Sequence, residues 1–519
     1  MRLAILHHHL DPGGVTRVVA AHLRSLDASP TDRLAVDGDR LDPRVVVLSG
    51  PRTGGWEADT LAALETVEVD LRIVPELEYD DRSDFTAGQV VTAVRAALDA
   101  AGCGPGETLL HVHNHSLGKS VAFAEAVPRL ADAGYRLLLQ THDFCEDFRP
   151  ELYRKVHDAL GDRLAATLYP DRAGVHYATL QSRDMRALAG VGLPPERLHV
   201  LPNPAPPPPE LPTKDEARRH ADEKLGLPRD HPFWLYPVRG IRRKNLGEIV
   251  LLSVLKPDVT FGVSLAPTNP VERPFFDHWR DFAAARGLPV LFDVGGKGKL
   301  SFEQNLAASD ALVTTSVAEG FGMVFVEPWL IGRPLYGRDL PEILHDDAGR
   351  VMQYPNLYER LPVALNTDER QAYRDAVASQ AARLATAYGR RVPDDAEIER
   401  AVSAKFDDGD AIDFADLDEP LQERVIDRLI EDDAAREAVR AGIAGKLNRS
   451  EDQAVVIEAN AVAARHHYGL EHLGGVLRAT YHAVMHDVGP ATGSPPNADA
   501  LLDRFVGLDR LRLIRGLTD

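Results

Sequence analysis

The chain has little cysteine, no long apolar run and no surplus of positive charge, and each absence argues against a class of protein. Two cysteines among 519 residues, Cys103 and Cys145, argue against a disulfide scaffold and favour the cytoplasm. No stretch approaches the roughly 18 uninterrupted apolar residues of a membrane-spanning helix. The formal charge of −20 opposes the wrapping of a polyanion, so we expect no nucleic-acid partner.

The rest of the composition is that of a globular protein with more than one domain. Apolar residues make up 44% of the chain and charged residues 27%, which is ordinary for such proteins. The chain is too long for one core, so we expect two domains of about 200 residues each. The first residues, MRLAILHHHLDPGG, lack the basic start and the small-residue cleavage site of a signal peptide.

Short apolar runs alternate with amphipathic helical patterns along most of the chain. This alternation is typical of α/β proteins, in which a parallel sheet carries helices on both faces. The sequence therefore predicts two doubly wound domains, with ligands bound at the carboxyl ends of the strands. We predict strands at 2–6, 44–49, 71–74, 108–113, 136–142, 176–182, 197–203, 233–238, 259–266, 289–294, 311–316 and 334–337, and helices at 16–26, 87–101 and 118–131.

A proline-rich stretch marks the boundary between the two domains. PNPAPPPPELP, residues 202–212, cannot join a sheet or a helix and favours an extended spacer. We place the first domain at 1–205 and the second at 206–465. Residues from about 366 to 450 are mostly helical and charged, and we interpret them as an insertion that serves packing or an interface.

Two loops at predicted strand ends have the composition of an anion-binding site. Gly13 and Gly14 follow the first strand and precede a helix. The first amides of a helix are unpaired and can bind an anion, and glycines let a ligand approach the backbone closely. A purely structural turn explains these glycines equally well. Arg239 and the run Arg242–Lys244 follow the first strand of the second domain. A departing diphosphate without a metal ion needs such paired cationic donors, although solvated surface charge is an equal alternative for this loop alone.

A third loop, SVAEGFGMVFVEPW at 316–329, carries two carboxylates. If the run 323–331 is a helix, Glu319 lies in the loop that enters it and Glu327 lies inside its second turn. If both were helical they would lie roughly 12 Å apart along the axis. That exceeds the separation of about 5 to 9.5 Å in a glycosidase acid/base pair. We therefore predict that they hold two separate hydroxyl clusters.

A nucleotide sugar matches this span, with its sugar at Glu319, its ribose at Glu327 and its diphosphate between them. Amide donors for the diphosphate would come from the residues between the two carboxylates. The alternative is an amphipathic helix with an exposed glutamate at each end. We disfavour it because Glu327 is embedded in the apolar run MVFVEPWLI, where a charge without a partner is costly. The predicted donor-binding residues of this loop are Gly320, Phe321, Gly322, Met323 and Glu327.

Histidines alternate at the end of a strand in the first domain. His111, His113 and His115 share one face if the strand continues through them. Zinc binding is an alternative, but no cysteine or paired carboxylate lies nearby in the sequence to complete a tetrahedral set. We favour a polar cluster facing the ligand, with at least one histidine in a structural role, and we predict no metal site.

With these loops in place, the sequence resembles the retaining GT-B glycosyltransferases of family four. The strongest match is the E-x7-E pattern from Glu319 to Glu327. Arg239 and Lys244 match the family's Arg-x4-Lys, and Gly13-Gly14 its glycine loop. Further matches in the expected order are HVH at 111–113, THD at 141–143, LPNP at 201–204 and HHYGLEHLGGVLRATY at 466–481.

The resemblance implies two Rossmann-like domains facing a central cleft, with the acceptor on the first domain and the donor on the second. Residues 466–519 would form helices that cross back to the first domain. It implies transfer of a sugar from a nucleoside-diphosphate sugar to an acceptor hydroxyl with retained configuration, without a metal or cofactor. Arg239 and Lys244 would neutralise the diphosphate, Glu319 would orient the sugar, and His113, or else His115, would contact it.

Three other functions remain open at this point. A nucleotide-sugar epimerase or a sugar phosphorylase on the same architecture would bind the same groups without a second sugar acceptor. A non-catalytic protein that binds sugar nucleotides is the third alternative. The acceptor, the donor base and the donor sugar are not encoded in a readable pattern, and the helical insertion is a candidate surface for a homo-oligomer.

Overall fold

The computed structural model describes residues 1–29, 40–345, 347–406, 409–448, 451–490 and 496–517. Four residues of the predicted helical insertion, 407–408 and 449–450, lie outside this range. The chain divides into two units, Met1–Pro206 with His466–Gly507 and Pro207–Arg465 with Leu508–Asp519. Among the described residues, no helix has both the length and the apolar character needed to cross a membrane.

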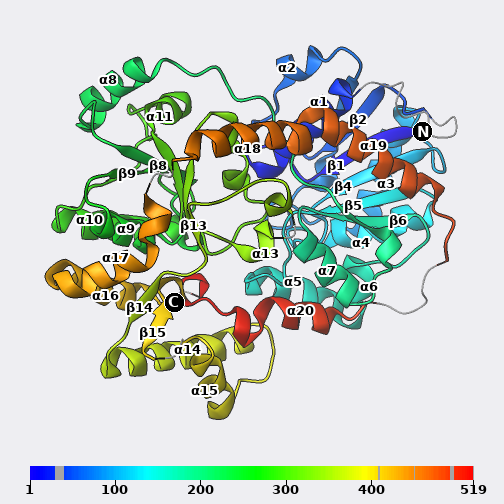
Figure 1. Ribbon diagram of the computed structural model, residues 1–519. Helices are drawn as coiled ribbons and strands as arrows, with labels where there is room; N and C mark the ends of the chain where they lie inside the picture. The colour runs from blue at the N-terminus through cyan, green and yellow to red at the C-terminus, as the bar shows by residue number, and fades with distance from the viewer. Residues whose placement is uncertain (30–39, 346, 407–408, 449–450, 491–495, 518–519) are drawn as a thin grey trace. The chain divides into compact units, whose positions relative to one another are not determined.

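The first unit contains a parallel sheet of seven strands in the order β3-β2-β1-β4-β5-β6-β7 (Figure 1). The order reverses between β1 and β4, because β2 and β3 extend the sheet on one side and β5 to β7 on the other. Such a switch point is where open parallel sheets bind ligands. The strands are β1 Arg2–His7, β2 Arg44–Ser49, β3 Glu68–Ile73, β4 Thr108–His113, β5 Arg136–Thr141, β6 Val175–Thr179 and β7 Leu198–Val200.

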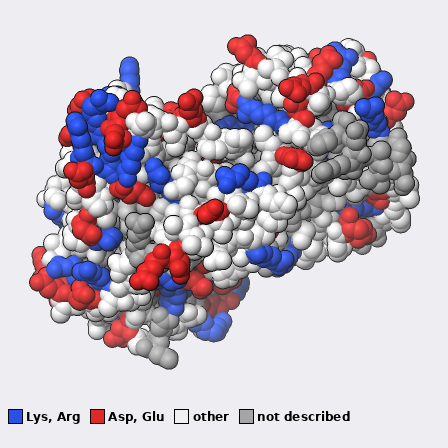
Figure 2. Space-filling model, turned by 45° about the horizontal axis from the view of Figure 1, so that its top comes forward, with Lys and Arg blue, Asp and Glu red and all other residues white. Residues whose placement is uncertain are grey.

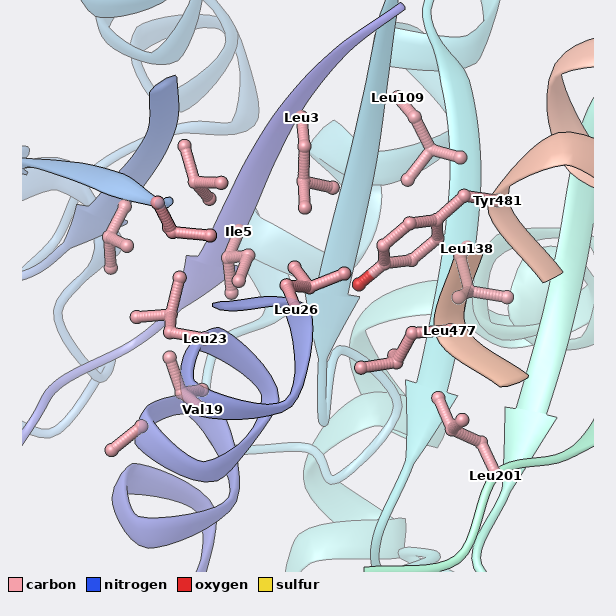
Figure 3. Close-up of a cluster of buried hydrophobic side chains, with 14 of the residues drawn as sticks. Leu3, Ile5, Val19, Leu23, Leu26, Leu109, Leu138, Leu201, Leu477 and Tyr481 are labelled. Atoms are coloured by element: carbon pink, nitrogen blue, oxygen red, sulfur yellow. The ribbon is translucent and has the colours of Figure 1, made fainter. Parts of the chain in front are cut away.

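Two helices that are far apart in the sequence lie side by side in the first unit. α1 spans Gly14–Ala28 and α19 spans Leu470–His486. Gly474 permits this close approach, since a Cβ at that position would lie 2.0 Å from the Ser25 carbonyl oxygen. Figure 3 shows the core that results, in which leucines of α1 and Leu477 and Tyr481 of α19 pack against apolar side chains of the sheet.

Polar capping residues mark the starts of two of the remaining helices of the first unit. Thr86 and Ser120 accept hydrogen bonds from the first turns of α3 and α4, and so mark where these helices begin. The helices are α2 Ala58–Ala62, α3 Ala87–Ala100, α4 Val121–Asp132, α5 Pro150–Leu160, α6 Leu164–Leu168, α7 Ser182–Gly190 and α20 Ala498–Val506. Helix α18, Gln453–Tyr468, begins in the second unit and ends in the first.

The second unit contains a parallel sheet of six strands in the order β10-β9-β8-β11-β12-β13. Its order reverses between β8 and β11, which makes the ends of these strands the second switch point. The prediction of two doubly wound parallel sheets is confirmed, and each predicted strand overlaps one of β1 to β12. The strands are β8 Phe233–Arg239, β9 Thr260–Leu265, β10 Val290–Phe292, β11 Ala311–Thr314, β12 Leu335–Arg338 and β13 Leu357–Tyr358, with the antiparallel pair β14 Pro362–Ala364 and β15 Ala411–Asp413.

A buried charge network joins three elements of the second unit. Arg338 at the end of β12 donates to Glu248 of α9 at 2.7 Å and to Asp413 of β15 at 2.8 Å. All three side chains are nearly inaccessible to solvent. Because a buried charge is tolerated only when it is paired, the network fixes the position of β15 against the sheet. The segment predicted as mostly helical therefore also contains a strand.

The helices of this segment pack on the rest of the second unit. α16 and α17 contact α9, every residue of which is buried. On the face that Figure 2 shows, Lys and Arg side chains are interspersed with Asp and Glu. The helices of the unit are α8 Lys214–Leu225, α9 Leu246–Leu255, α10 Arg273–Ala285, α11 Phe302–Ala308, α12 Glu327–Leu330, α13 Pro341–Leu344, α14 Thr367–Ala387, α15 Asp395–Ser403, α16 Glu419–Glu431 and α17 Asp433–Leu447.

Candidate active site

The cationic loop of the second unit lies at its switch point, directly after β8. A one-turn 3₁₀ helix, Arg242–Lys244, follows the strand, and α9 begins two residues later. Asn245 joins the two helices with a left-handed backbone (φ 49°). Its buried amide donates to Glu248 at 2.7 Å and accepts from Gln422 at 2.9 Å. These hydrogen bonds of the Asn245 side chain therefore hold the loop in one conformation.

Glu319 lies against this loop, between two cations. Lys244 Nζ donates to one carboxylate oxygen and Arg243 Nη1 donates to the other at 2.7 Å. Ser316 Oγ donates to the same carboxylate at 2.6 Å. Only 8% of the Glu319 side chain is exposed. The sequence predicted that these two loops act together, and the structure brings them into direct contact.

The charges of this cluster are set by their mutual contacts. Burial alone would raise the pKa of Glu319, but Lys244 and Arg243 outweigh it and lower that pKa to about 2. Burial lowers the pKa of Lys244, and the Glu319 carboxylate opposes that effect. Glu319 is thus ionised at neutral pH. One guanidinium and one ammonium group surround one carboxylate, which leaves the cluster with a surplus positive charge for an anionic ligand.

Buried hydroxyls hold the end of β11 against the cationic loop. Tyr236 OH lies 2.6 Å from Ser316 Oγ, to which it donates, and 3.2 Å from the Lys244 carbonyl oxygen. Thr315 Oγ1 donates to the same carbonyl at 2.9 Å. The backbone amide of Val317 donates to the Arg243 carbonyl at 2.9 Å and so joins the two loops directly. The geometry of the cluster is therefore determined by neighbouring strands rather than by flexible loop ends.

Arg239, which was predicted to contact the diphosphate together with Lys244, does not contact Glu319. It is the last residue of β8 and is exposed, whereas Arg243 occupies the place beside Glu319. Arg243 is one of the four cations of the predicted loop, but only Arg239 and Lys244 were predicted to contact the diphosphate. A signal was available, since Arg243 is adjacent to Lys244 in the same cationic run.

Residues 323–331 do not form one continuous α-helix. A 3₁₀ turn spans Met323–Phe325, and α12 begins only at Glu327. Pro328 explains the break, because proline lacks an amide hydrogen and fits the first turn of a helix but not its interior. Glu327 is therefore the first residue of a helix instead of a member of its second turn. The separation of roughly 12 Å, which assumed one continuous helix, does not apply.

The prediction that Glu327 is embedded among apolar side chains is also wrong. Its side chain is exposed, although Val326 and Pro328 on either side are buried. The glycine loop before it is tightly built: Gly322 has a left-handed backbone (φ 82°), and a Cβ there would lie 2.7 Å from the Phe325 ring. Phe321 is buried, Gly320 and Met323 are partly exposed, and the loop presents its backbone near Glu319.

In the first unit, the three predicted histidines do not share one face. His111 and His113 lie on β4, but Asn114 has a left-handed backbone (φ 55°) and turns the chain away. Its side chain accepts from the amide of His142 at 2.8 Å. His115 therefore leaves the sheet and donates to the Leu168 carbonyl at 2.7 Å.

His111 fills the structural role expected of one of these histidines. Its Nε2 bonds to Gln140 Oε1 and its Nδ1 to Tyr481 OH, both at 2.9 Å. His113 bonds through Nδ1 to His142 Nε2 at 2.8 Å and is fully buried. Burial lowers the pKa of His111 to about 3 and the pKa of His113 well below its ordinary value. Both imidazoles are therefore neutral at physiological pH.

The glycine pair stands at the start of α1. Gly13 caps the helix in an extended conformation and Gly14 is its first residue. Neither has a positive φ, and a Cβ at Gly14 would meet no described atom within 4 Å. The described fold therefore has no steric need for a glycine at position 14, unlike the close contact at Gly474.

No protein-family model matches the chain. Over 435 residues it is 26% identical to the mannosylglucosyl-3-phosphoglycerate synthase of Petrotoga mobilis, which covers 81% of this chain and 80% of that enzyme. A sucrose-phosphate synthase from Thermosynechococcus elongatus shares its architecture with a TM-score of 0.51 and 14% identity over 93% of this chain and 98% of that one.

A glycosyltransferase from Rickettsia africae gives a TM-score of 0.52 with 12% identity, over 94% of this chain and 99% of that one. These solved structures confirm the predicted two-domain α/β fold of the GT-B type. The relative from P. mobilis confirms the coarser functional prediction that the protein is a glycosyltransferase.

Proposed function

We propose that the protein transfers a sugar from a nucleoside-diphosphate sugar to an acceptor hydroxyl, with retained anomeric configuration and without a metal ion. The observation that carries this proposal is the cluster of Arg243, Lys244 and Glu319 at the switch point of the second sheet. It combines cations for a diphosphate with a carboxylate for sugar hydroxyls. A site with only one of these charges would not match both ends of such a donor.

The two cations stabilise the diphosphate as it departs. Negative charge grows on the leaving phosphate oxygen as the bond to the anomeric carbon breaks, and fixed donors favour that state over the bound donor. Lys244 is nearly buried, so its interaction with a phosphate is screened less than that of a surface lysine. Arg239, at the exposed end of the same loop, is a further proposed contact for the diphosphate.

Retention follows if the acceptor attacks the face from which the diphosphate leaves. The bond between the anomeric carbon and the phosphate oxygen breaks, a bond to the acceptor oxygen forms, and the hydroxyl proton passes to the departing phosphate. The resemblance to family four supports this course. Glu319, ionised and held by three donors, would accept hydroxyls of the sugar, and the exposed Glu327 would accept those of the ribose.

The first unit would bind the acceptor. Open space beside Gly14 supports the approach of a ligand to the backbone at the start of α1. His113, at the end of β4, is the predicted contact at the reacting sugar. The relative from P. mobilis is named for making a glycosylated phosphoglycerate, so small anionic carbohydrates are the first acceptors to test. A location in the cytoplasm and assembly into a homo-oligomer are also proposed.

The test is a panel of nucleotide sugars incubated with the protein, with and without acceptors and with a chelator present. We expect a glycosylated product and a free nucleoside diphosphate only when an acceptor is added. The proton NMR spectrum of the product should show the same anomeric configuration as the donor sugar. Conversion of the donor alone would indicate an epimerase, and a requirement for inorganic phosphate would indicate a phosphorylase. Nucleotide binding without turnover across the whole panel would indicate a binding protein.

A matched pair of variants tests the site itself. Arg243→Met removes a cation that touches Glu319, whereas Arg239→Met removes an exposed cation of the same loop. We expect Arg243→Met to lower kcat about 10²-fold, in the range seen when one donor to a transition-state oxyanion is removed. Arg239→Met should act mainly on the KM of the donor. Equal and small effects of both changes would argue against the cluster as the catalytic site.

A further inference from the structure

Residues 508–517 belong to the second unit, although the residues just before them, His466–Gly507, belong to the first. We call residues 508–517 the return segment. It forms two one-turn 3₁₀ helices, Leu508–Arg510 and Leu513–Arg515. In Figure 1 it is drawn in red and lies beside β15. Its second 3₁₀ helix packs against the turn Arg242–Lys244, which carries the two cations beside Glu319.

Apolar packing and backbone hydrogen bonds hold the return segment in place. Leu511, Leu513 and Ile514 are buried. The backbone amide of Leu517 donates to Gln380 Oε1 at 3.1 Å, and its carbonyl accepts from Gln380 Nε2 at 3.2 Å. Burial of apolar side chains and pairing of backbone groups both favour an ordered conformation. The return segment is therefore an integral part of the second unit.

Arg512 attaches the return segment to two buried carboxylates. Its Nη1 donates to Asp416 Oδ1 and lies 3.7 Å from Asp413 Oδ2. Only 5% of the Asp416 side chain and 3% of the Asp413 side chain are exposed. Burial alone would raise the pKa of Asp413, but Arg338 and Arg512 outweigh it and lower that pKa. Arg512 is thus held by charges that water screens only weakly.

A continuous chain of polar contacts joins Arg512 to the residue that follows the cationic turn. Its members in order are Arg512, Asp413, Arg338, Glu248 and Asn245. The first contact measures 3.7 Å, and the other three measure 2.7–2.8 Å. A buried charge that loses its partner is costly, so the chain resists displacement of its members. The return segment therefore touches the turn directly and also supports it through these charges.

We infer that the return segment positions the cationic turn for sugar transfer, and that Arg512 is the positioning residue that anchors it. The inference rests on the proposed function, because the turn carries the cations for the departing diphosphate. The segment keeps Arg243 and Lys244 where negative charge grows on the phosphate. Such placement matters, since a shift of about 1 Å at a catalytic group can lower turnover about 10²-fold even when the mutated residue is far from the reaction.

The test is a matched pair of variants of the full-length protein that each remove one cation from Asp416. Arg512→Met detaches the return segment, whereas Lys405→Met removes a cation that lies outside it, 3.1 Å from the same carboxylate. We expect Arg512→Met to lower kcat about 10- to 10²-fold and to leave the KM of the acceptor unchanged. Lys405→Met should keep the parent kcat, and Arg512→Lys, which preserves the charge, should recover part of the loss. Both Met variants are assayed at a temperature at which circular dichroism shows them folded.

Hydrogen exchange gives a readout that does not depend on turnover. Amides of residues 241–247 should exchange faster in Arg512→Met than in the parent protein and in Lys405→Met, while peptides from β9 stay unchanged. Ile514→Ala, which loosens the packing of the same segment, should act in the same direction. Unchanged exchange at 241–247 in both segment variants, or equal effects of Arg512→Met and Lys405→Met on kcat, would overturn the inference. A parent protein that transfers no sugar would refute the proposed function instead, and the exchange result would still show whether the segment holds the turn.

Discussion

The buried carboxyl of Glu146 gives the first unit a stability that should fall as the pH rises. Glu146 is completely buried, and it accepts hydrogen bonds from Tyr169 OH at 3.1 Å and from Cys145 Sγ at 3.3 Å. Burial raises its pKa from 4.5 to about 7, despite these hydrogen bonds. The folded protein therefore binds a proton here that the unfolded chain releases at lower pH.

The sign and the size follow from this difference. Because the folded pKa is the higher one, the stabilisation is complete below pH 4.5 and is lost as the pH rises through 7. Each pKa unit is worth about 1.4 kcal/mol, so the whole shift corresponds to about 3 kcal/mol. A typical free energy of unfolding is roughly 5–15 kcal/mol, which makes this one group a substantial part of it.

Glu146→Gln isolates the effect, because glutamine has the shape of the protonated acid and does not titrate. We expect the variant to match the parent protein within about 1 kcal/mol at pH 5 and to exceed it by about 3 kcal/mol at pH 8. Buried histidines of the first unit also change stability with pH, but both proteins share them, so they cancel in the difference.

The assay is urea unfolding at pH 5, 6, 7 and 8, followed by hydrogen exchange of peptides from β5 and β6. Reading these peptides matters because a chain of two units need not unfold in one step. A difference between the two proteins that stays constant from pH 5 to pH 8 would refute the reasoning. It would mean that Glu146 is ionised in the folded protein and that its burial is compensated by another group.

Three further predictions concern the second unit. Lys244→Met should lower kcat about 10²–10³-fold with unchanged circular dichroism, and near-native turnover would exclude Lys244 from the mechanism. Glu319→Gln should lower kcat/KM for the complete donor while leaving the affinity for the free nucleoside diphosphate, measured by calorimetry, equal or higher; a weaker diphosphate complex would contradict the role at the sugar. Arg338→Met leaves the buried Glu248 without its cation and leaves Asp413 with only Arg512, at 3.7 Å. It should destabilise the second unit by about 3–5 kcal/mol in urea unfolding, and a loss below about 1 kcal/mol would show that the carboxylates become protonated.

Much of the fold could be predicted from local patterns. Apolar runs such as Arg44–Ser49 become buried parallel strands because a strand covered on both faces needs apolar side chains at every position. The same pattern places the loops after β1, β4, β8 and β11, where the candidate site residues were sought. The missed strands β13 to β15 have two or three residues each, which is too short for a periodic signal.

The site was less accessible to this reasoning, because its details depend on backbone turns. Glu327 is exposed because the helical run breaks near Pro328. The apolar residues around Glu327 in the sequence predict burial instead. The departure of His115 from the sheet follows from the left-handed backbone of Asn114. The choice of Arg243 rather than Arg239 beside Glu319 depends on a single 3₁₀ turn. In each case one or two dihedral angles decide where a charged or polar group lies.

The sequence by itself determined that two parallel sheets form and which loops end at their switch points, because burial of apolar side chains acts at every residue of a strand. It also determined that cations and carboxylates are present in those loops. Only the tertiary structure decided which of them meet: Glu319 with Arg243 and Lys244. Those contacts join residues 75 or 76 positions apart, and no local propensity acts over that distance.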